Sequence, residues 1–367
     1  MTMWLIILAA VLAAFAAGTA YLTIAVGRFG LIKKLSGGRK WLKGLISLGI
    51  IAIVFAALVL LTSVTNAIII VLSTLMFFLI YGLIFRIIKA VRKKEFTCNW
   101  AGWLSLVSSA VYLAIGYYLC FHVWQTDYTL STDKNIPHLR IALIADSHMG
   151  TTFDGEGFAK QLDRIMEQKP DMLLIAGDFV DDSTNREDML TACSALGKLK
   201  LDRGAFYCYG NHDKSYYGSE HRGFSAEDLA AELEKNGVRV LEDSVYSDGN
   251  ITLIGRRDNG EGKRKEISEL MKAVPAESYT IVLDHQPTDY DNEAAANADL
   301  VVSGHTHGGQ LFPVTYVGEW FSINDATYGH ERRKNTDFIV TSGISDWEIL
   351  FKTGTKSEYV IIDIERF

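Results

Sequence analysis

Four long apolar stretches in the first third of the chain restrict most strongly what it can fold into. Each has about the 20 residues that a helix needs to cross a bilayer, and none carries a charged side chain. They are Trp4–Val26, Leu45–Thr65, Asn66–Phe85 and Ala101–Phe121. Only the terminal amine precedes the first stretch as a positive charge, whereas a secretory signal peptide begins with a basic region. We therefore expect four transmembrane helices, the first retained and the second and third joined as a hairpin at Asn66.

Charge divides the chain where these stretches end. Residues 1–124 hold 11 Lys+Arg and one acidic residue, Glu95, a net charge of +10. Residues 125–367 hold 25 Lys+Arg and 42 Asp+Glu, a net charge of −17. We expect a membrane region over 1–124, a polar linker over 125–138 and a soluble domain over 139–367. Because so acidic a surface repels polyphosphate backbones, nucleic acid is not an expected partner.

The loops between the apolar stretches predict how the chain is oriented in the cell membrane. Positively charged loops stay in the cytoplasm. The basic residues of the first loop and the third connection are Arg28, Lys33, Lys34, Arg39, Lys40 and Lys43, then Arg86, Lys89, Arg92, Lys93 and Lys94. The second loop has none. We therefore expect a multi-pass membrane protein whose N-terminus and soluble half lie on the extracytoplasmic side.

The membrane region lacks the side chains that transport usually requires. Transporters keep ionisable residues at mid-membrane, but none of the four stretches has one near its centre, and residues such as Ser105, Ser108 and Tyr112 are only mildly polar. We interpret this region as a membrane anchor. The alternative interpretation is that the membrane helices bind a lipid substrate directly.

Short apolar runs alternate with helical patterns in the soluble half. The strand candidates are Ile141–Ala145, Met172–Ala176, Ala205–Tyr209, Ile251–Ile254, Tyr279–Leu283, Leu300–Ser303, Phe338–Ser342 and Tyr359–Ile364. Apolar residues at helical spacing lie over Phe158–Gln168, and a further helix is expected around Glu187–Leu199. This alternation indicates an α/β architecture.

Polar clusters end nearly every strand candidate. They are Asp146-Ser-His148, Gly177-Asp178, Gly210-Asn211-His212-Asp213, Asp284-His285 and Gly304-His305-Thr306-His307. In open α/β sheets ligands collect beyond the carboxyl ends of the strands, so we expect the clusters to converge on one small volume. Glycine directly before Asp178, Asn211 and His305 lets the backbone turn sharply there and keeps bulk away from the site.

The donor atoms of these clusters predict a metal site. Two aspartates, one asparagine and four histidines, without a thiolate, suit Mn, Zn or Fe. Seven ligands are too many for one tetrahedral ion but fit two divalent ions about 3.5–4 Å apart, if one carboxylate bridges them. Between such ions a shared hydroxide can attack phosphorus in line while the ions neutralise the developing charge. A histidine left over from coordination can protonate the leaving oxygen.

The order DxH, GD, GNHD, H and GHTH over about residues 138–365 resembles the calcineurin-like metallophosphoesterases. The stretch GHTHGGQ at Gly304–Gln310 is similar to their bacterial membrane-associated branch. The resemblance implies two packed β-sheets flanked by helices. It also implies two sets of ligands that share a bridging carboxylate: Asp146, His148, Asp178 and His307 for one metal, and Asp178, Asn211, His285 and His305 for the other. His212 is then the general acid, with Asp213 beside it as an orienting partner.

The sequence departs from this branch near its C-terminus. The branch usually has a Gly-Trp-Gly-Pro-Pro-x-Arg-like stretch after a Ser-Gly strand end, whereas Ser342 here begins the run SGISDWEILFK. Trp347 is kept, and Lys352 stands near the expected arginine, but lysine does not reproduce the bidentate fork of arginine. We expect hydrolysis to be kept and substrate preference to differ. Lys352 is a candidate substrate-binding residue, as are Arg332 and Arg333 of a local basic run that is otherwise a solvated turn.

The sequence thus predicts a membrane-tethered, two-metal phosphoric ester hydrolase. Attack by a metal-bridging hydroxide would cleave a phosphomonoester, phosphodiester or diphosphate. A lipid-linked or cell-envelope substrate fits best, since tethering raises the effective concentration on membrane substrates. One alternative is a membrane transport or sensing protein whose esterase domain is regulatory; the lack of intramembrane charge opposes it. A second is a non-hydrolytic metal-binding scaffold, which the complete set of ligand positions opposes.

Overall fold

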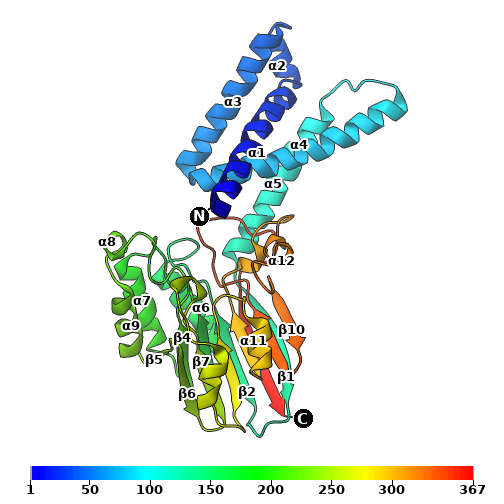
Figure 1. Cartoon of the computed structure of the whole chain (residues 1–367). Coiled ribbons are helices and arrows are strands. Elements are labelled where there is room, and N and C mark those ends of the chain that lie inside the picture. The colour runs from blue at the N-terminus through cyan, green and yellow to red at the C-terminus, as the bar shows by residue number, and fades with distance from the viewer. Residues whose placement is uncertain (1, 367) are drawn as a thin grey trace. The chain divides into compact units, whose positions relative to one another are not determined.

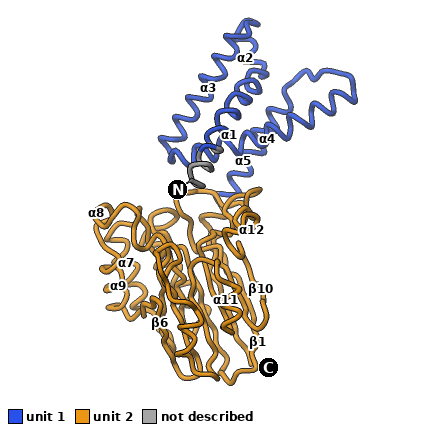
Figure 2. Tube along the Cα trace, in the orientation of Figure 1, with its two compact units in different colours: residues 1–116 blue, residues 117–367 orange. Residues whose placement is uncertain are grey.

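The computed structural model describes residues 2–366, without the side chains of 2–8, 10 and 11. The outer bounds of the two expected regions, Met1 and Phe367, lie outside the described residues. The chain divides into two compact units, residues 1–116 and residues 117–367, which Figure 2 shows in different colours.

Unit 1 is built from apolar helices. They are α1 (Thr2–Val26), α2 (Gly30–Leu35), α3 (Lys40–Leu61), α4 (Val64–Arg92) and α5 (Trp100–Phe121), whose last five residues belong to unit 2. Within the described residues, α3, α4 and α5 are long and apolar enough to cross a membrane, and α1 is apolar over Leu12–Val26. Three to four helices could therefore span a bilayer, and they coincide with the four predicted stretches.

The hairpin between α3 and α4 begins at a side-chain cap. The Ser63 hydroxyl accepts a hydrogen bond from the backbone N–H of Asn66 at 3.1 Å, which satisfies one of the free donors at the start of α4. At its other end, α4 continues past the predicted limit of Phe85 to Arg92 because residues 86–92 contain neither Gly nor Pro. It ends where Lys93 adopts the left-handed conformation, with φ 52°.

Unit 2 contains, over the part of the chain that the structure describes, two six-stranded sheets. Sheet A has the order β1-β12-β2-β3-β4-β5, and sheet B has the order β10-β11-β9-β8-β7-β6. The strands of sheet A are β1 (Trp124–Thr132), β2 (Leu139–Ile144), β3 (Met172–Ala176), β4 (Gly204–Cys208), β5 (Val238–Val240) and β12 (Glu358–Arg366). Those of sheet B are β6 (Ser244–Asp248), β7 (Ile251–Gly255), β8 (Tyr279–Leu283), β9 (Leu300–Ser303), β10 (Gly329–Arg333) and β11 (Thr336–Val340). All the strand candidates are confirmed.

The two sheets pack face to face, and helices cover their outer faces. The inner core joins residues of both sheets, such as Leu174 and Phe206 of sheet A with Ile281 and Val302 of sheet B. The outer face of sheet A carries α6 (Gly155–Met166), α7 (Arg186–Leu196) and α9 (Ala226–Lys235). The outer face of sheet B carries α10 (Ile267–Leu270) and α11 (Tyr290–Ala295). The predicted α/β fold of two packed sheets flanked by helices is confirmed.

Parallel pairing brings the carboxyl ends of the central strands together. In sheet A, β2, β3, β4 and β5 are parallel neighbours, and in sheet B so are β7, β8, β9 and β11. The two sheets meet at these strand ends. Nδ1 of His285, after β8, lies 2.7 Å from the carbonyl oxygen of Ala176 at the end of β3. Figure 1 shows these strand ends on the same side of unit 2.

Residues 125–138 are not the polar linker that their composition suggests. Trp124–Thr132 form β1, which runs parallel to β12 from Trp124 paired with Glu358 to Thr132 paired with Arg366. Because β1 is the edge strand of sheet A, one side of it faces solvent, and only Leu130 and Thr132 are buried. The polar side chains that suggested a linker are those of a half-exposed edge strand.

Candidate metal centre

The predicted ligands all lie in the loops directly after strands. Asp146 and His148 follow β2, Asp178 follows β3, Asn211 follows β4, His285 follows β8, and His305 and His307 follow β9. Since β2, β3 and β4 belong to sheet A and β8 and β9 to sheet B, the site is complete only when the two sheets pack.

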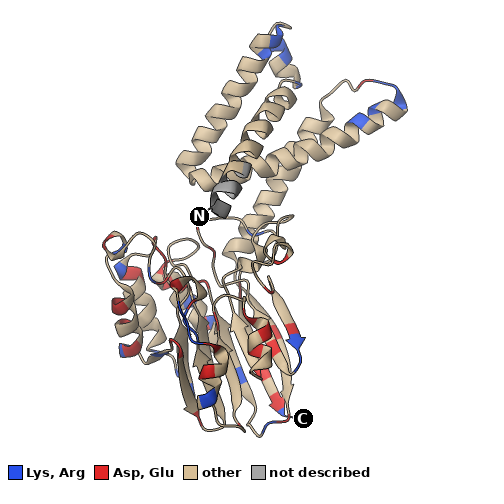
Figure 3. Ribbon diagram, in the orientation of Figure 1, with Lys and Arg blue, Asp and Glu red and all other residues tan. Residues whose placement is uncertain are grey.

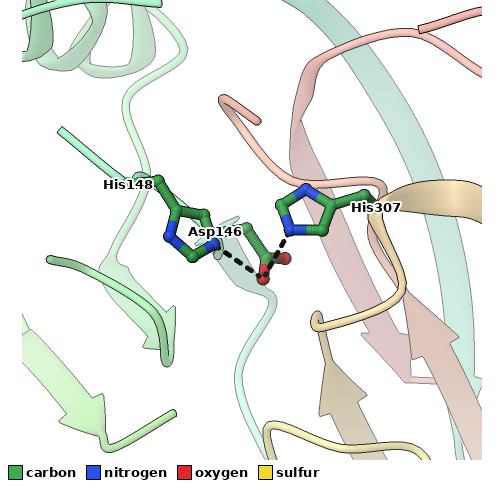
Figure 4. Close-up of side chains that lie close together, drawn as sticks. All are labelled: Asp146, His148 and His307. Carbon is green, nitrogen blue, oxygen red and sulfur yellow. Dashed lines mark ion pairs between the residues drawn. The ribbon is translucent and has the colours of Figure 1, made fainter. Parts of the chain in front are cut away.

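Asp146, His148 and His307 form one group of converging ligand atoms, here named group A (Figure 4). These atoms all lie within 4.8 Å of one another. The Asp146 Oδ1 atom lies 4.0 Å from Nε2 of His148 and 3.9 Å from Nε2 of His307. Two ligands that are each about 2.1 Å from one ion lie at most about 4.2 Å apart. Group A therefore has the spacing of a metal site.

Asp178, His285 and His305 form the second group, named group B, whose ligand atoms also lie within 4.8 Å of one another. Nε2 of His285 is 3.1 Å from Oδ2 of Asp178. Asn211 joins this group, since its Oδ1 atom lies 2.8 Å from Nδ1 of His305. The same Oδ2 atom of Asp178 is 3.5 Å from Nε2 of His148 in group A. Asp178 thus lies between the two groups.

Three of the histidines have an acceptor beside the ring nitrogen that faces away from the centre. Nδ1 lies 3.3 Å from Asp181 Oδ2 in His148, 3.2 Å from Asp346 Oδ1 in His307 and 2.7 Å from the Ala176 carbonyl oxygen in His285. An acceptor at Nδ1 favours a proton there and leaves the lone pair of Nε2 free, which is the arrangement typical of metal-ligating histidines.

Sequence reasoning missed Asp181 and Asp346. Asp181 follows Asp178 by three residues in the same loop, so a second carboxylate after the β3 strand end was the available signal. Asp346 follows β11, a strand end without a histidine, and sequence spacing alone does not connect it with His307. Both carboxylates are fully buried.

Unpaired nitrogen atoms support the fit of a metal pair. Among the described residues, Nε2 of His148 and Nε2 of His285 are buried without a hydrogen-bond partner, although carboxylate oxygens lie near both. A buried polar atom left unpaired costs about 1–3 kcal/mol, and a bound cation removes this cost. The nitrogen and oxygen donors of both groups therefore fit two divalent ions of the Mn, Zn or Fe type.

The backbone of the site is strained where it carries ligands. The positive φ angles at ligand positions are 53° at Asp146, 35° at His148, 50° at Asp178, 71° at His305 and 48° at His307. Residues other than glycine rarely adopt this region, and such strain gathers at functional sites. Glycine is required nearby, since a Cβ on Gly304 would lie 2.5 Å from Oδ2 of Asp146.

The His212 imidazole lies beside group A without forming part of it. Its ring centroid is 5.0 Å from that of His148 and 4.8 Å from that of the half-exposed Trp347. The backbone N–H of His212 donates to Oδ1 of Asp178 at 2.8 Å, which links its position to the centre. Burial lowers the pKa of His212 to about 4, because a charged imidazolium is poorly solvated there.

Asp213 serves the backbone of the site instead of orienting His212. Its buried carboxylate accepts hydrogen bonds from the N–H groups of Asp178 at 2.8 Å, Val180 at 3.1 Å and Gly210 at 2.7 Å. Burial and then the nearby Asp178 raise the pKa of Asp213 to about 7. Within the described structure, Nδ1 of His212 is buried without a hydrogen-bond partner. Asp213 therefore does not orient His212 as predicted. Its carboxylate links the loop after β3 to the loop after β4.

The structure does not bring the three candidate substrate-binding cations to the ligands. Arg332 and Arg333 pair in register with Asp337 and Thr336, at the start of β11, and so lie at the opposite end of sheet B from His305. Figure 3 shows blue, for Lys and Arg, on the strand β10 to which they belong. Lys352 is 0% exposed, and its Nζ atom lies 3.1 Å from Oδ1 of Asp346 and 2.7 Å from the carbonyl oxygen of Ser342. It approaches the centre only through Asp346.

Known proteins resemble this chain over the same region. The family model for calcineurin-like phosphoesterases matches residues 139–309. An uncharacterized metallophosphoesterase of Aquifex aeolicus is 34% identical over 200 residues, covering 52% of this chain and 72% of that protein. One of Helicobacter pylori is 29% identical over 268 residues, covering 67% and 69% respectively. A transmembrane protein with a metallophosphoesterase domain from Danio rerio is 28% identical over 244 residues, covering 64% and 54%. The chain is a membrane protein that belongs to the calcineurin-like metallophosphoesterase family, as the motif resemblance predicted.

Proposed function

We propose that this protein is a membrane-tethered, metal-dependent phosphoesterase. The observation that carries the proposal is the position of the Asp178 carboxylate, whose Oδ2 atom lies 3.1 Å from His285 of group B and 3.5 Å from His148 of group A. A carboxylate shared by two ligand groups is what a bridged metal pair requires.

The two groups define which residues hold which ion. Asp146, His148 and His307 would hold the first, Asp178 would border both, and His285, His305 and Asn211 would complete the second. Two bound divalent ions supply Lewis acidity, which lowers the pKa of water and offsets the negative charge of phosphoryl oxygens. The protein contributes orientation, because Asp181 and Asp346 hold the rings of His148 and His307.

His212 is the proposed general acid. Its ring lies at the rim of group A beside Trp347, close enough to meet the leaving group of a phosphate held there. The imidazole is neutral near pH 7 as it stands, since burial lowers its pKa. A general acid must carry a proton when the substrate is bound, and an anionic phosphate beside the ring favours that form.

The proposed substrates are phosphates at the membrane surface: a lipid-linked phosphate or diphosphate, or a cell-envelope phosphodiester. The chain tethers unit 2 to apolar helices, which raises its effective concentration on such substrates. Both basic loops of the membrane region favour an extracytoplasmic position for unit 2. Protease treatment of intact cells tests that position, since a cytoplasmic unit 2 would survive treatment.

Hydrolysis of bis(p-nitrophenyl) phosphate by the purified full chain with Mn²⁺ tests the activity. We expect Asp178→Asn to lower kcat by about 100-fold or more, because it removes the shared carboxylate of the metal site. His212→Ala should lower kcat by less on this ester, because its leaving group needs little protonation. The matched control is His330→Ala, because His330 lies on the edge strand β10 and its ring pairs with Asp337, at the start of β11. Full activity of Asp178→Asn and His212→Ala would refute the proposal.

The leaving group gives a second test of His212. A p-nitrophenolate leaves easily without a proton, whereas an alkoxide does not. We therefore expect His212→Ala to lose more activity on a methyl or glyceryl phosphodiester than on bis(p-nitrophenyl) phosphate. An equal loss on both esters would show that His212 acts in another way.

A further inference from the structure

Residues 311–323, here named the aromatic loop, expose large apolar side chains on unit 2. The exposed ones are Phe312 at 61%, Val314 at 54%, Tyr316 at 51%, Trp320 at 69%, Phe321 at 73% and Ile323 at 45%. Glu319 is the single charged residue in this stretch of the sequence. Exposed apolar surface of this density marks a site that meets another apolar partner.

The aromatic loop is an ordered part of unit 2. The short helix α12 (Val317–Trp320) lies within it (Figure 1), and the N–H of Phe321 donates to the carbonyl oxygen of Val317 at 3.1 Å. The loop is also tied to a neighbouring segment, since the N–H of Phe312 donates to Oγ1 of Thr353 at 3.0 Å. Its apolar side chains are therefore presented by a folded support.

The segment that contacts the aromatic loop, residues 353–357, also contacts the end of the apolar helix α5. Within unit 2, the N–H of Ser357 donates to the carbonyl oxygen of Leu119 at 2.9 Å, and its hydroxyl donates to that of Cys120 at 2.7 Å. Thr353 lies four positions before Ser357, a span of at most about 14 Å. The aromatic loop and the end of a predicted membrane helix thus contact the same short segment, residues 353–357.

The chemistry of the exposed side chains matches the surface of a bilayer. Trp and Tyr gather where a membrane meets water because each has an apolar body and a polar tip. At the end of α5, Tyr117 and Tyr118 are exposed as well, so the same residue types occur on both segments. A lipid surface explains this composition better than a protein partner, since residues 311–323 offer a single charge for recognition.

The aromatic loop is continuous with the metal centre. It begins four residues after the ligand His307, and a Cβ on Gly309 would lie 2.1 Å from the carbonyl oxygen of Thr315, so the two segments pack tightly. We propose that the aromatic loop inserts into the lipid–water interface and holds group A at the headgroup layer, where it meets phosphate esters of membrane lipids. The substrate part of this inference rests on the proposed phosphoesterase function, and the membrane contact does not.

Fluorescence quenching tests the membrane contact. The full chain carries an environment-sensitive dye at Trp320→Cys in a Cys98→Ser background, because Cys98 is exposed and the other three cysteines are buried. The control carries the dye at Asn335→Cys, an exposed turn beside Thr336 at the start of β11. In phosphatidylcholine nanodiscs with a nitroxide near the headgroup, we expect at least twofold quenching at position 320 and none at 335. Equal emission at both positions overturns the contact, as does a response at position 320 that follows protein concentration and not the nitroxide, which indicates a second copy.

Two substrates test the role of the contact. We expect the double variant Trp320→Ser, Phe321→Ser to lose at least tenfold in kcat/KM on dioleoyl phosphatidic acid in nanodiscs and to keep its rate on bis(p-nitrophenyl) phosphate. Equal effects on both substrates, or a wild type that cleaves only the soluble ester, overturn the substrate part. A wild type that cleaves neither ester refutes the phosphoesterase function, while the quenching result still decides whether the loop meets the membrane.

Discussion

Asp346 gives a quantitative prediction for metal binding. Its Oδ1 atom lies 3.2 Å from Nδ1 of His307, and the carboxylate is fully buried. A carboxylate at this position raises the basicity of a ligating imidazole, and its loss typically lowers metal affinity 10–100-fold. We therefore expect Asp346→Asn to weaken the binding of one of the two ions by about 1.4–2.7 kcal/mol. The other ion stays tightly bound, because His307 belongs to group A alone.

Lys352 complicates this substitution and also provides a way to separate its effects. Without Asp346, the buried Nζ atom of Lys352 keeps two carbonyl acceptors, Ser342 at 2.7 Å and Ser345 at 3.5 Å, but no counter-charge. Breaking a buried ion pair from one side costs about 3–5 kcal/mol of stability. The double variant Asp346→Asn, Lys352→Met removes both charges, so we expect its stability to recover while its metal affinity stays low.

Competition with a fluorescent chelator for Mn²⁺ measures the affinities of the full chain in detergent. Asp337→Asn is the matched control. Asp337 lies at the start of β11, at the end of sheet B away from the ligands, and its Oδ1 atom is 2.8 Å from Nε2 of His330. The substitution therefore removes a comparable carboxylate–histidine contact. The control should bind both ions as the wild type does. Unchanged affinity in Asp346→Asn, or an equal loss in the control, would show that Asp346 does not support the metal site.

Three further predictions concern metal and stability. Chelation of the metals should lower the melting temperature, since ions at 100 times Kd contribute about 2.7 kcal/mol; identical calorimetric traces with and without EDTA would contradict occupied sites. Gly304→Ala should cost one ion per chain in metal analysis with an unchanged circular dichroism spectrum, because the new Cβ meets Asp146 at 2.5 Å. Arg256→Met should lower stability by about 3–5 kcal/mol in pulse proteolysis, because Glu293 loses the buried cation 3.3 Å away, while Asp284 keeps Arg264 at 2.9 Å; an unchanged urea midpoint would show that this network is dispensable.

Central strands were predictable from the sequence, and edge strands were not. Strands such as β3 and β8 are buried on both faces, so they appear in the sequence as unbroken apolar runs. The edge strands β1, β5, β6 and β10 keep exposed or half-exposed positions and look like polar loops. Their pairing depends on a neighbouring strand that is distant in the chain, as for β1 and β12.

The candidate ligands were predictable because each stands next to a strand end in a recognisable local motif. The supporting residues depend on contacts between distant segments. Asp346 lies 3.2 Å from His307, 39 positions away in the chain, and Lys352 faces inward to Asp346 where the family resemblance suggested a substrate contact. For Asp213, the motif placed the residue correctly beside His212, but side-chain direction decided that it holds the backbone.

By itself, the sequence determined which elements and ligands the protein has: apolar helices of membrane length, an acidic α/β unit, and nitrogen and oxygen donors at successive strand ends. These properties are local, since length, hydropathy and strand-end position are all read within a few residues. Only the tertiary structure decided which donors share Asp178, which carboxylates hold the histidines, and that the exposed aromatic side chains of residues 311–323 share a support with the end of α5. Those relations join segments that are far apart in the chain, and they exist only once two packed sheets bring the strand ends together.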